Sequence, residues 1–211
     1  MMGTGTLAVW NDRAAGHETD YENWYQNEHL PERLGVPGFI RGRRYQAIEA
    51  TPEFFTWYEV ESPSVLRSEA YKTRLANPTP WTQKIMTKTF LNASRTVCRR
   101  AVIAGEVFGS VSVVARFDSS IDEKLILNVL SKIDNPTALA RAEQWVRDEA
   151  PDDDAMAEEA IRGPDQKIAA CWMFEFLREA DAQALTSVLR NEFEAAVVGM
   201  YRLLCERGRA L

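Results

Sequence analysis

Hydrophobic and polar positions form the same series of patterns twice along the chain, once in each half. Apolar residues at every second position predict strands, and apolar residues at spacings of three and four predict helices. Each half is predicted to run strand, helix, strand, strand, helix, strand. These elements are expected at 6–12, 21–35, 39–48, 54–61, 64–76 and 95–103, and again at 110–118, 121–133, 138–146, 167–177, 181–195 and 198–207.

Residue matches between the halves support a duplication. Arg-x-x-Cys-x-Arg occurs at 95–100 and again at 202–207, and Trp-Tyr-Glu-Val at 57–60 aligns with Met-Phe-Glu-Phe at 173–176. The two segments of the second match are further apart in the chain than those of the first match, and an acidic insertion at 151–166 explains the difference. We therefore predict an α+β protein of two ferredoxin-like β-α-β-β-α-β units, with their antiparallel sheets packed face to face as a fused dimeric α/β-barrel.

The predicted units cover residues 1–105, which carry the candidate site, and 106–211, a degenerate copy with the acidic insertion. The boundary is placed in Ala-Gly-Glu-Val-Phe-Gly, where two glycines separate two strands. The alternative is a pair of unrelated α+β domains whose matches arise by chance.

The first helical segment carries an aromatic stripe. Thr19 followed by Glu22 forms a capping box, which predicts the helix start. Four positions fall on one face of this helix, namely Tyr21, Trp24, Tyr25 and Glu28. His29 lies at the edge of the stripe. Burying a carboxylate without a partner costs free energy, so Glu28 needs a cationic partner or a ligand.

Pro31 interrupts this helix. Proline lacks the N–H that would bond back to Asn27, so we expect a kink or restart there, and Gly35 is expected to end the helix. Glu28 and His29 would then lie near an irregular turn and could face a cavity. The alternative is that the stripe is ordinary core packing and that His29 is a hydrogen-bonded structural residue.

The segment Phe-Ile-Arg-Gly-Arg-Arg-Tyr at 39–45 offers cationic partners. Alternation places Arg41, Arg43 and Tyr45 on one face of the strand, and Gly42 and Arg44 on the other. We expect Arg41 and Arg43 to hold the carboxylate of Glu28 or a substrate anion. The alternative is a solvated edge with ordinary ion pairs. The second half lacks both the histidine and the arginine cluster, which favours a site in the first half.

Composition narrows the functional classes. Hydrophobic residues make up 45% of the chain and charged residues 27%, as in soluble globular proteins. The net charge is +2 over residues 1–105 (13 basic, 11 acidic) and -8 over 106–211 (12 basic, 20 acidic). Neither half offers a basic surface for nucleic acid or an anionic membrane. The absence of a long apolar run or a signal-like start, with three scattered cysteines, predicts a cytoplasmic protein with reduced thiols.

Two further segments are expected to be structural and to carry no chemistry. The acidic run at 151–159 lacks the ligand spacing of a calcium loop and is expected to be a solvated loop and helix start. The segment Thr-Pro-Trp-Thr at 79–82 is expected to be a proline-fixed loop on the core. No phosphate-binding glycine loop, nucleophile elbow or zinc-protease motif occurs.

The sequence around the first helix resembles the dimeric α/β-barrel superfamily. The resemblance rests on Trp-Tyr-x-x-x-His-Leu-Pro at 24–31, on Val-Pro-Gly-Phe at 36–39 and on the duplicated topology. Within the superfamily it is closest to EthD-like and related bacterial proteins. Known activities of the superfamily include lactone isomerisation, cofactor-free oxygenation of polyketide-like aromatics, haem degradation and aldoxime dehydration. The resemblance implies His29 as the candidate functional histidine.

We therefore expect a cofactor-free enzyme that acts on a small hydrophobic or aromatic carbonyl compound. His29 would be the general acid or base, Glu28 or Tyr25 would orient it, and Arg41 or Arg43 would stabilise an anion. The substrate-binding residues would be Tyr21, Trp24, Tyr25, Arg41, Arg43 and Tyr45. The alternatives are a non-catalytic module that binds a hydrophobic ligand, haem binding through His29, or a structural role for these residues. A homodimer is left open.

Overall fold

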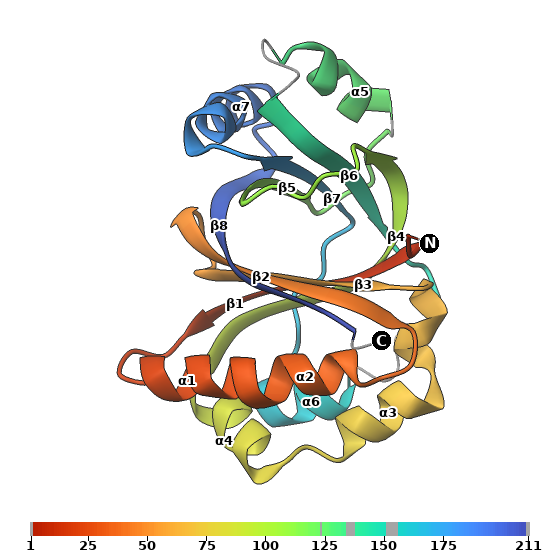
Figure 1. The fold of residues 1–211 in the computed structure, drawn as a ribbon, viewed down its shortest axis with the longest axis vertical. Helices are drawn as coiled ribbons and strands as arrows, with labels where there is room; N and C mark the ends of the chain where they lie inside the picture. The colour runs from red at the N-terminus through yellow and green to blue at the C-terminus, as the bar shows by residue number, and fades with distance from the viewer. Residues whose placement is uncertain (1, 123, 134–137, 151–155, 210–211) are drawn as a thin grey trace.

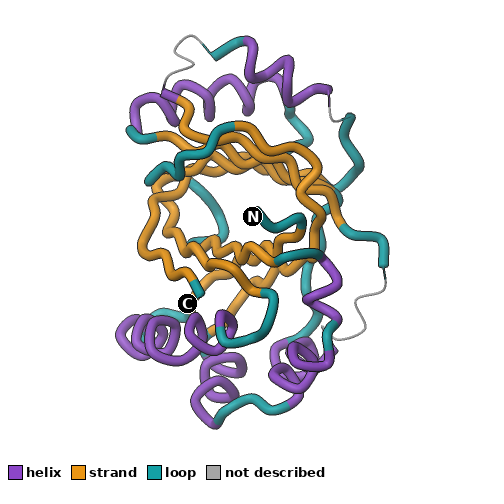
Figure 2. Tube along the Cα trace, turned by 45° about the vertical axis from the view of Figure 1, so that its right-hand side comes forward, coloured by secondary structure: helices purple, strands orange, loops and turns teal. Residues whose placement is uncertain are grey.

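The computed structural model describes the chain except residues 1, 123, 134–137, 151–155 and 210–211. Eight strands form one closed barrel, and helices cover it on two opposite sides (Figure 1). Viewed along another direction, the strands encircle a common interior (Figure 2). None of the described helices is long and apolar enough to cross a membrane.

The first half supplies four strands and most of the helices. In order these are β1 (Gly5–Arg13), α1 (Glu18–Trp24), the π-helical turn η1 (Tyr25–His29), α2 (Leu30–Leu34), β2 (Phe39–Glu49), β3 (Phe54–Val60), the 3-10 turn η2 (Pro63–Arg67), α3 (Glu69–Ala76), α4 (Pro80–Lys88) and β4 (Phe90–Ala104).

The second half repeats the plan with one addition. Its elements are β5 (Val111–Phe117), α5 (Lys124–Ser131), β6 (Leu139–Arg147), α6 (Met156–Arg162), β7 (Ala170–Phe176), α7 (Glu179–Glu192) and β8 (Val197–Gly208). The added helix, α6, lies in the insertion between β6 and β7. It packs against α3 and α4 of the first half, far from α5 and α7 (Figure 1).

The strand order confirms the duplication. The barrel runs β1-β3-β2-β8-β5-β7-β6-β4, so the first half has the order β4-β1-β3-β2 and the second has the equivalent β8-β5-β7-β6. All neighbours are antiparallel. The pairs β2–β8 and β4–β6 join the halves. The fold is thus α+β, with two ferredoxin-like units closed into one barrel, and closure needs no second copy.

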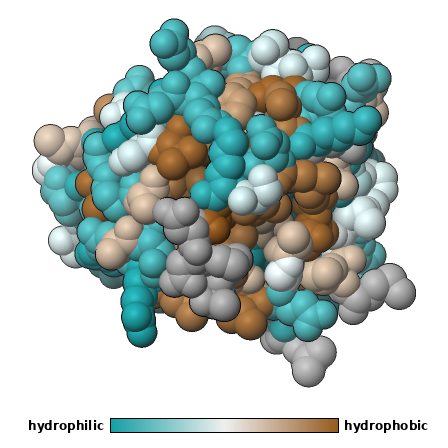
Figure 3. Space-filling model, turned by 90° about the horizontal axis from the view of Figure 1, so that it is seen from above, coloured by the Kyte–Doolittle hydropathy of each residue, from teal (hydrophilic) through white to brown (hydrophobic). Residues whose placement is uncertain are grey.

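Closure buries the inner face of the strands and the helices cover much of the outer face, whereas β8 is buried only at 199–201. One core lies under the helices of the first half, a second lies under α5 and α7, and a third fills the interior. On the side of α5 and α7, apolar side chains reach the surface among polar ones (Figure 3), including Leu125 and Leu127. A cavity of about 210 Å³ lies there, between α5 and α7.

The first helix differs from its prediction in two ways. It begins at Glu18 with His17 at the N-cap and no side-chain cap, so the capping box is wrong; Glu22 instead binds Arg44. At Pro31 the helix continues through the wider turn η1, in which the N–H of Leu30 donates to the carbonyl five residues back. A π turn of this kind lets the helix absorb a disrupted hydrogen bond without breaking. Gly35 is the C-cap, as predicted.

Two predictions of irregular structure also need correction. Thr79 caps α4, because its hydroxyl accepts a hydrogen bond from the Thr82 N–H at 3.0 Å, so 79–82 is a helix start. Residues 151–155 of the acidic run lie outside the described residues. The helix that follows them is not solvated throughout, since Glu158 is buried. The reason is its docking against the first half.

Candidate functional site

The predicted site residues fall on two faces of one sheet. Tyr21, Trp24, Tyr25 and His29 lie between the first helix and the outer face of the sheet. The side chains of Arg41, Arg43 and Tyr45 belong to the barrel interior. The alternation predicted for β2 is confirmed. The helix, however, covers the face that bears Gly42 and Arg44, so the sheet separates the two predicted groups.

Glu28 does not pair with Arg41 or Arg43, and that expectation is wrong. Its Oε1 atom accepts hydrogen bonds from the hydroxyls of Thr79 at 2.5 Å and Thr82 at 2.9 Å. These contacts tie the first helix to the start of α4. A carboxylate that accepts two hydroxyls is satisfied without a cation.

The aromatic stripe packs tightly and its polar atoms have fixed partners. The hydroxyl of Tyr25 donates to Thr56 at 2.9 Å, and the indole N–H of Trp24 donates to Thr82 at 3.0 Å. The guanidinium of Arg44 lies 4.2 Å from the ring centre of Tyr25 and also contacts Tyr21. Burial raises the pKa of both tyrosines, so their hydroxyls stay protonated. The stripe is therefore a wall of packed rings.

His29 differs from its neighbours in having no such partner. Its ring is buried, with its centre 4.3 Å from that of Trp24 and 5.0 Å from that of Tyr25. Among the residues that the structure describes, none hydrogen-bonds to this imidazole. Burial, and then the positive charge of Arg33, lower its pKa well below 6.5. The imidazole is therefore neutral at neutral pH, with one nitrogen free to accept a proton.

Two small cavities border His29, of about 20 Å³ and about 10 Å³. The larger has room for about one water molecule. Besides His29, its lining includes Tyr25, Arg33, Tyr58, Tyr71 and Glu158. It is thus a narrow space bordered by aromatic rings, by the buried ion pair of Arg33 with Glu158, and by Arg162, which lies 3.6 Å from Glu158.

That ion pair joins the first half to the insertion. Arg33 of α2 donates to Glu158 of α6, and both side chains are buried. Burial alone would raise the pKa of Glu158, but the charges of Arg33, Arg162 and Arg95 outweigh it and hold the pKa at about 2. Glu158 therefore stays ionised beside His29 across the physiological range.

Sequence reasoning missed both members of this pair. Arg33 could have been found, because it lies four residues after His29 and so shares its side of the helix. Glu158 had no usable signal. It is 125 residues from Arg33 in the chain and stands in an acidic run whose composition suggests solvent exposure.

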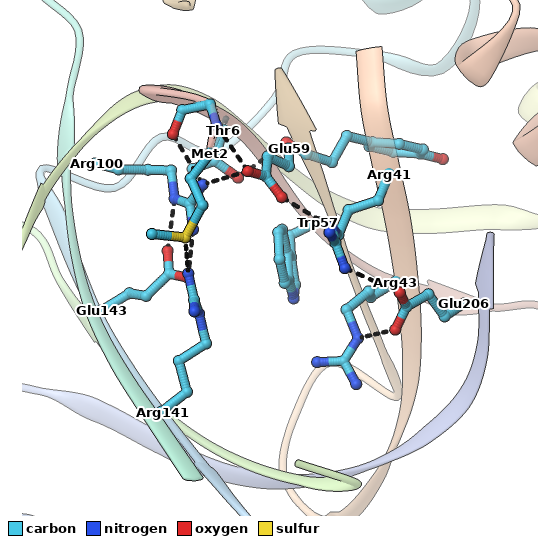
Figure 4. A network of polar contacts seen from close by, with 12 residues as sticks. Met2, Thr6, Arg41, Arg43, Trp57, Glu59, Arg100, Arg141, Glu143 and Glu206 are labelled. Atoms are coloured by element: carbon cyan, nitrogen blue, oxygen red, sulfur yellow. Dashed lines mark hydrogen bonds and ion pairs between the residues drawn. The ribbon is translucent and has the colours of Figure 1, made fainter. Parts of the chain in front are cut away.

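A second polar cluster occupies the barrel interior (Figure 4). Arg100 bridges Glu59 and Glu143, and Arg141 also binds Glu143. The remaining contacts are Arg41 to Glu59 and Glu206, Arg43 to Glu175 and Glu206, and Tyr45 to Glu175.

Four guanidinium groups thus face four carboxylates, and the charges balance. The sequence did hold a signal for this cluster, because Glu59 and Glu175 occupy matching positions of the repeat within apolar strands. The described residues contain no group of histidine, cysteine and acidic side chains suited to a metal ion. The arginines and glutamates of the interior cluster satisfy one another, so the cluster is best explained as a network that stabilises the barrel. His29, which has no hydrogen-bond partner among the described residues, is the better candidate for a functional group.

Comparisons with known proteins identify a fold. No family model and no curated protein matches the chain. An anthrone oxidase-like protein is similar in structure, with a TM-score of 0.61 and 8% identity over 100% of this chain and 95% of that one. A candidate monooxygenase from Fusobacterium nucleatum has a TM-score of 0.57 and 9% identity over 100% of this chain and 97% of its own. A candidate chlorite dismutase has a TM-score of 0.56 and 11% identity over 97% of this chain and 96% of its own.

At such identities the likeness concerns the fold alone. These structures cover almost the whole chain, so the similarity extends to both halves. The strand order, the antiparallel pairing and these neighbours agree. The chain has the fold of the ferredoxin-like dimeric α/β-barrel proteins, with both units in one polypeptide.

Proposed function

We propose that this chain binds a small hydrophobic or aromatic carbonyl compound at His29, and that His29 removes a proton from it. The observation that carries the proposal is a buried, neutral imidazole without a hydrogen-bond partner among the described residues, bordering a cavity. A buried polar group without a partner costs free energy unless a ligand or water satisfies it. The lone pair of His29 is therefore available to a ligand.

The surroundings suit the abstraction of a proton that a carbonyl group acidifies, either as its direct neighbour or through a conjugated ring. The proton would pass from carbon to the imidazole, and the negative charge would move to the carbonyl oxygen. Arg33 could stabilise that oxygen, because its guanidinium borders the same cavity. The carboxylate of Glu158 favours the protonated imidazole, since it acts to raise the pKa of His29. The anionic oxygen would thus face the guanidinium of Arg33, and the imidazolium of His29 would face the carboxylate of Glu158.

This assignment keeps His29 from the sequence prediction and changes its helpers. Arg33 and Glu158 replace Arg41, Arg43 and Glu28, which the structure ties to other partners. Tyr25 remains a wall of the cavity.

Ligand binding must enlarge the cavity. A space of about 20 Å³ holds one water and not a ring. The contact that closes it is the ion pair of Arg33 with Glu158, which joins α2 to the seven-residue helix α6. In the proposal, α6 shifts only far enough for the anionic oxygen of the ligand to share Arg33 with Glu158, which stays beside His29.

Haem does not fit this site. A porphyrin is far larger than the two cavities beside His29, and the imidazole lies against the rings of Trp24 and Tyr25. The Trp-Tyr-x-x-x-His-Leu-Pro segment supports a place beside EthD-like proteins within the fold, and this finer grouping is part of the proposal.

A non-catalytic binding module is the second candidate, and one observation favours it. Among the described residues, no carboxylate orients the His29 ring, because Glu28 is bound to two threonines. A general base is usually held in place by such a group. The same experiment separates the two candidates.

The test uses anthrone, the compound in the name of one similar structure. Its methylene protons are acidified by the ring ketone, and their exchange is followed by NMR in D2O without oxygen. Wild type should accelerate exchange, and His29→Gln should slow it by 100-fold or more, on the order of a general base's contribution. His17→Gln, which changes the other histidine of the chain, should exchange normally.

The outcomes are distinct. Undiminished exchange in a folded His29→Gln protein would contradict the role of His29. Thermal stabilisation of wild type by anthrone without any exchange would favour the binding module. Neither binding nor exchange would exclude both candidates for this class of compound.

A further inference from the structure

Another cavity, of about 130 Å³, lies at the end of the barrel opposite the charged network. The register fixes its position. Ser94 pairs with Trp10 near the far end of β1, whereas the network gathers around Gly5 at the near end. The cavity is bordered by strands of both halves, through Ser94 of β4 and Arg116 of β5. It shares no residue with the site at His29.

Ser94 gives the cavity an unsatisfied polar group. The residue is 1% exposed, and its hydroxyl has no hydrogen-bond partner among the described residues. The backbone here is held firmly, because the N–H of Arg95 donates to the carbonyl of Gln166 at 3.1 Å and the N–H of Gln166 donates to Ala93 at 3.0 Å. A buried hydroxyl left without a partner destabilises the fold. A ligand that accepts from this hydroxyl would remove that destabilisation.

Arg116 supplies a positioned cation. Its Nη2 atom donates to the carbonyl of Thr51 at 2.7 Å, and its guanidinium lies 5.1 Å from the ring centre of Trp10. One of its five N–H donors is thus used for positioning, and the others can bind an anion. Lys167 borders the same cavity and also lies 3.4 Å from Glu159. With Asp118 counted, the lining carries two cations and one carboxylate.

The remaining wall is apolar and the space is small. Ile168 is buried at the floor of the cavity and Val197 lies at its edge. A cavity of about 150 Å³ is known to hold a benzene ring, so this one suits a single small ring or a short chain. The guanidinium donors of Arg116, a hydroxyl and an apolar wall together favour an organic anion over an inorganic one.

We propose that this end of the barrel binds a small organic carboxylate. The carboxylate would accept hydrogen bonds from Arg116 and Ser94, with Lys167 adding charge, and its hydrocarbon part would contact Ile168 and Val197. The site is independent of the proton abstraction proposed at His29.

Benzoate is the probe, titrated into the full chain and followed by amide chemical shifts in two-dimensional NMR. Saturable shifts are expected at residues 94, 116, 168 and 197. Arg116→Gln should weaken binding 10-fold to 100-fold, the loss typical of one charge-assisted hydrogen bond. Ser94→Ala should weaken it about 2-fold to 10-fold while making the free protein at least as stable as wild type, because it removes a buried hydroxyl without a partner among the described residues.

Two controls make the test decisive. Arg202→Gln removes an exposed arginine paired with Glu179 and should bind benzoate like wild type. Benzamide keeps the ring and lacks the charge, so wild type should bind it at least 10-fold more weakly; this arm needs no variant. Equal affinity for benzoate and benzamide, unchanged affinity in Arg116→Gln, or the absence of shifts at the four positions would each overturn the proposal.

Discussion

Replacing Glu158 with glutamine tests the ion pair that joins the insertion to the first half. The variant keeps the size of the side chain and removes its charge, which leaves the buried guanidinium of Arg33 without a counter-ion. Arg162 and Arg95 lie close enough to lower the pKa of Glu158, so they also lose their nearby negative charge. Breaking a buried pair from one side costs about 3–5 kcal/mol.

The pKa gives a second measure of the same interaction. The carboxyl has a pKa of about 2 in the fold against 4.5 as its ordinary value. At about 1.4 kcal/mol for each pH unit, the folded state gains about 3 kcal/mol at pH 7. Because the folded pKa is the lower one, this stability is complete above pH 4.5 and is lost as the pH falls towards 2. At pH 3 about 1 kcal/mol should remain.

The assay is urea denaturation of wild type and Glu158→Gln at pH 7 and pH 3. The difference in unfolding free energy should be about 3 kcal/mol at pH 7 and about 1 kcal/mol at pH 3. Glu159→Gln is the matched control, because Glu159 is on the same helix and pairs with Lys167 at the surface. It should cost less than about 1 kcal/mol. Equal losses in the two variants, or a difference that does not narrow in acid, would refute the reasoning.

Two further predictions concern the barrel. Gly42→Ala would place a methyl group 2.6 Å from Leu30 and 2.9 Å from the ring of Tyr58, so it should cost about 1–3 kcal/mol in urea denaturation. The methyl group of Gly208→Ala meets nothing within 4 Å, so this variant should unfold with nearly the wild-type free energy. If Gly42→Ala lost no more stability than Gly208→Ala, the helix that carries Leu30 would have moved away from the new methyl group, contrary to the prediction. Glu143→Gln leaves two buried guanidinium groups underpaired and should cost about 3–5 kcal/mol. Glu206→Gln, at the exposed edge of the network, should cost far less, and equal costs would contradict a buried network.

The first half shows where local patterns suffice. The alternation along β2 correctly separates Arg41, Arg43 and Tyr45 from Gly42 and Arg44, because side chains alternate across any extended strand. The same pattern does not tell which face a helix will cover. Glycine at position 42 could have suggested it, since Leu30 of the helix packs directly against that glycine.

The insertion shows where local patterns fail. An acidic run next to a short helix indicates solvent exposure on composition alone. Its helix instead docks on the first half, and Glu158 finds Arg33 there. A buried charge is stable only when a partner of opposite charge is in reach, and the partner here is set by docking rather than by the neighbouring residues.

Periodicity and matches along the chain predict the eight strands, the duplication, the barrel class and the two faces of each strand, because these are local properties of the sequence. Only the tertiary structure shows the helices α4 and α6 and the strand pairs that join the halves, β2 with β8 and β4 with β6, because these depend on contacts between distant residues. Closure supplies Glu143, Glu175 and Glu206 of the second half as partners for arginines of the first. Those arginines are thereby committed to the interior, whereas His29 lies beneath the helices without a hydrogen-bond partner among the described residues.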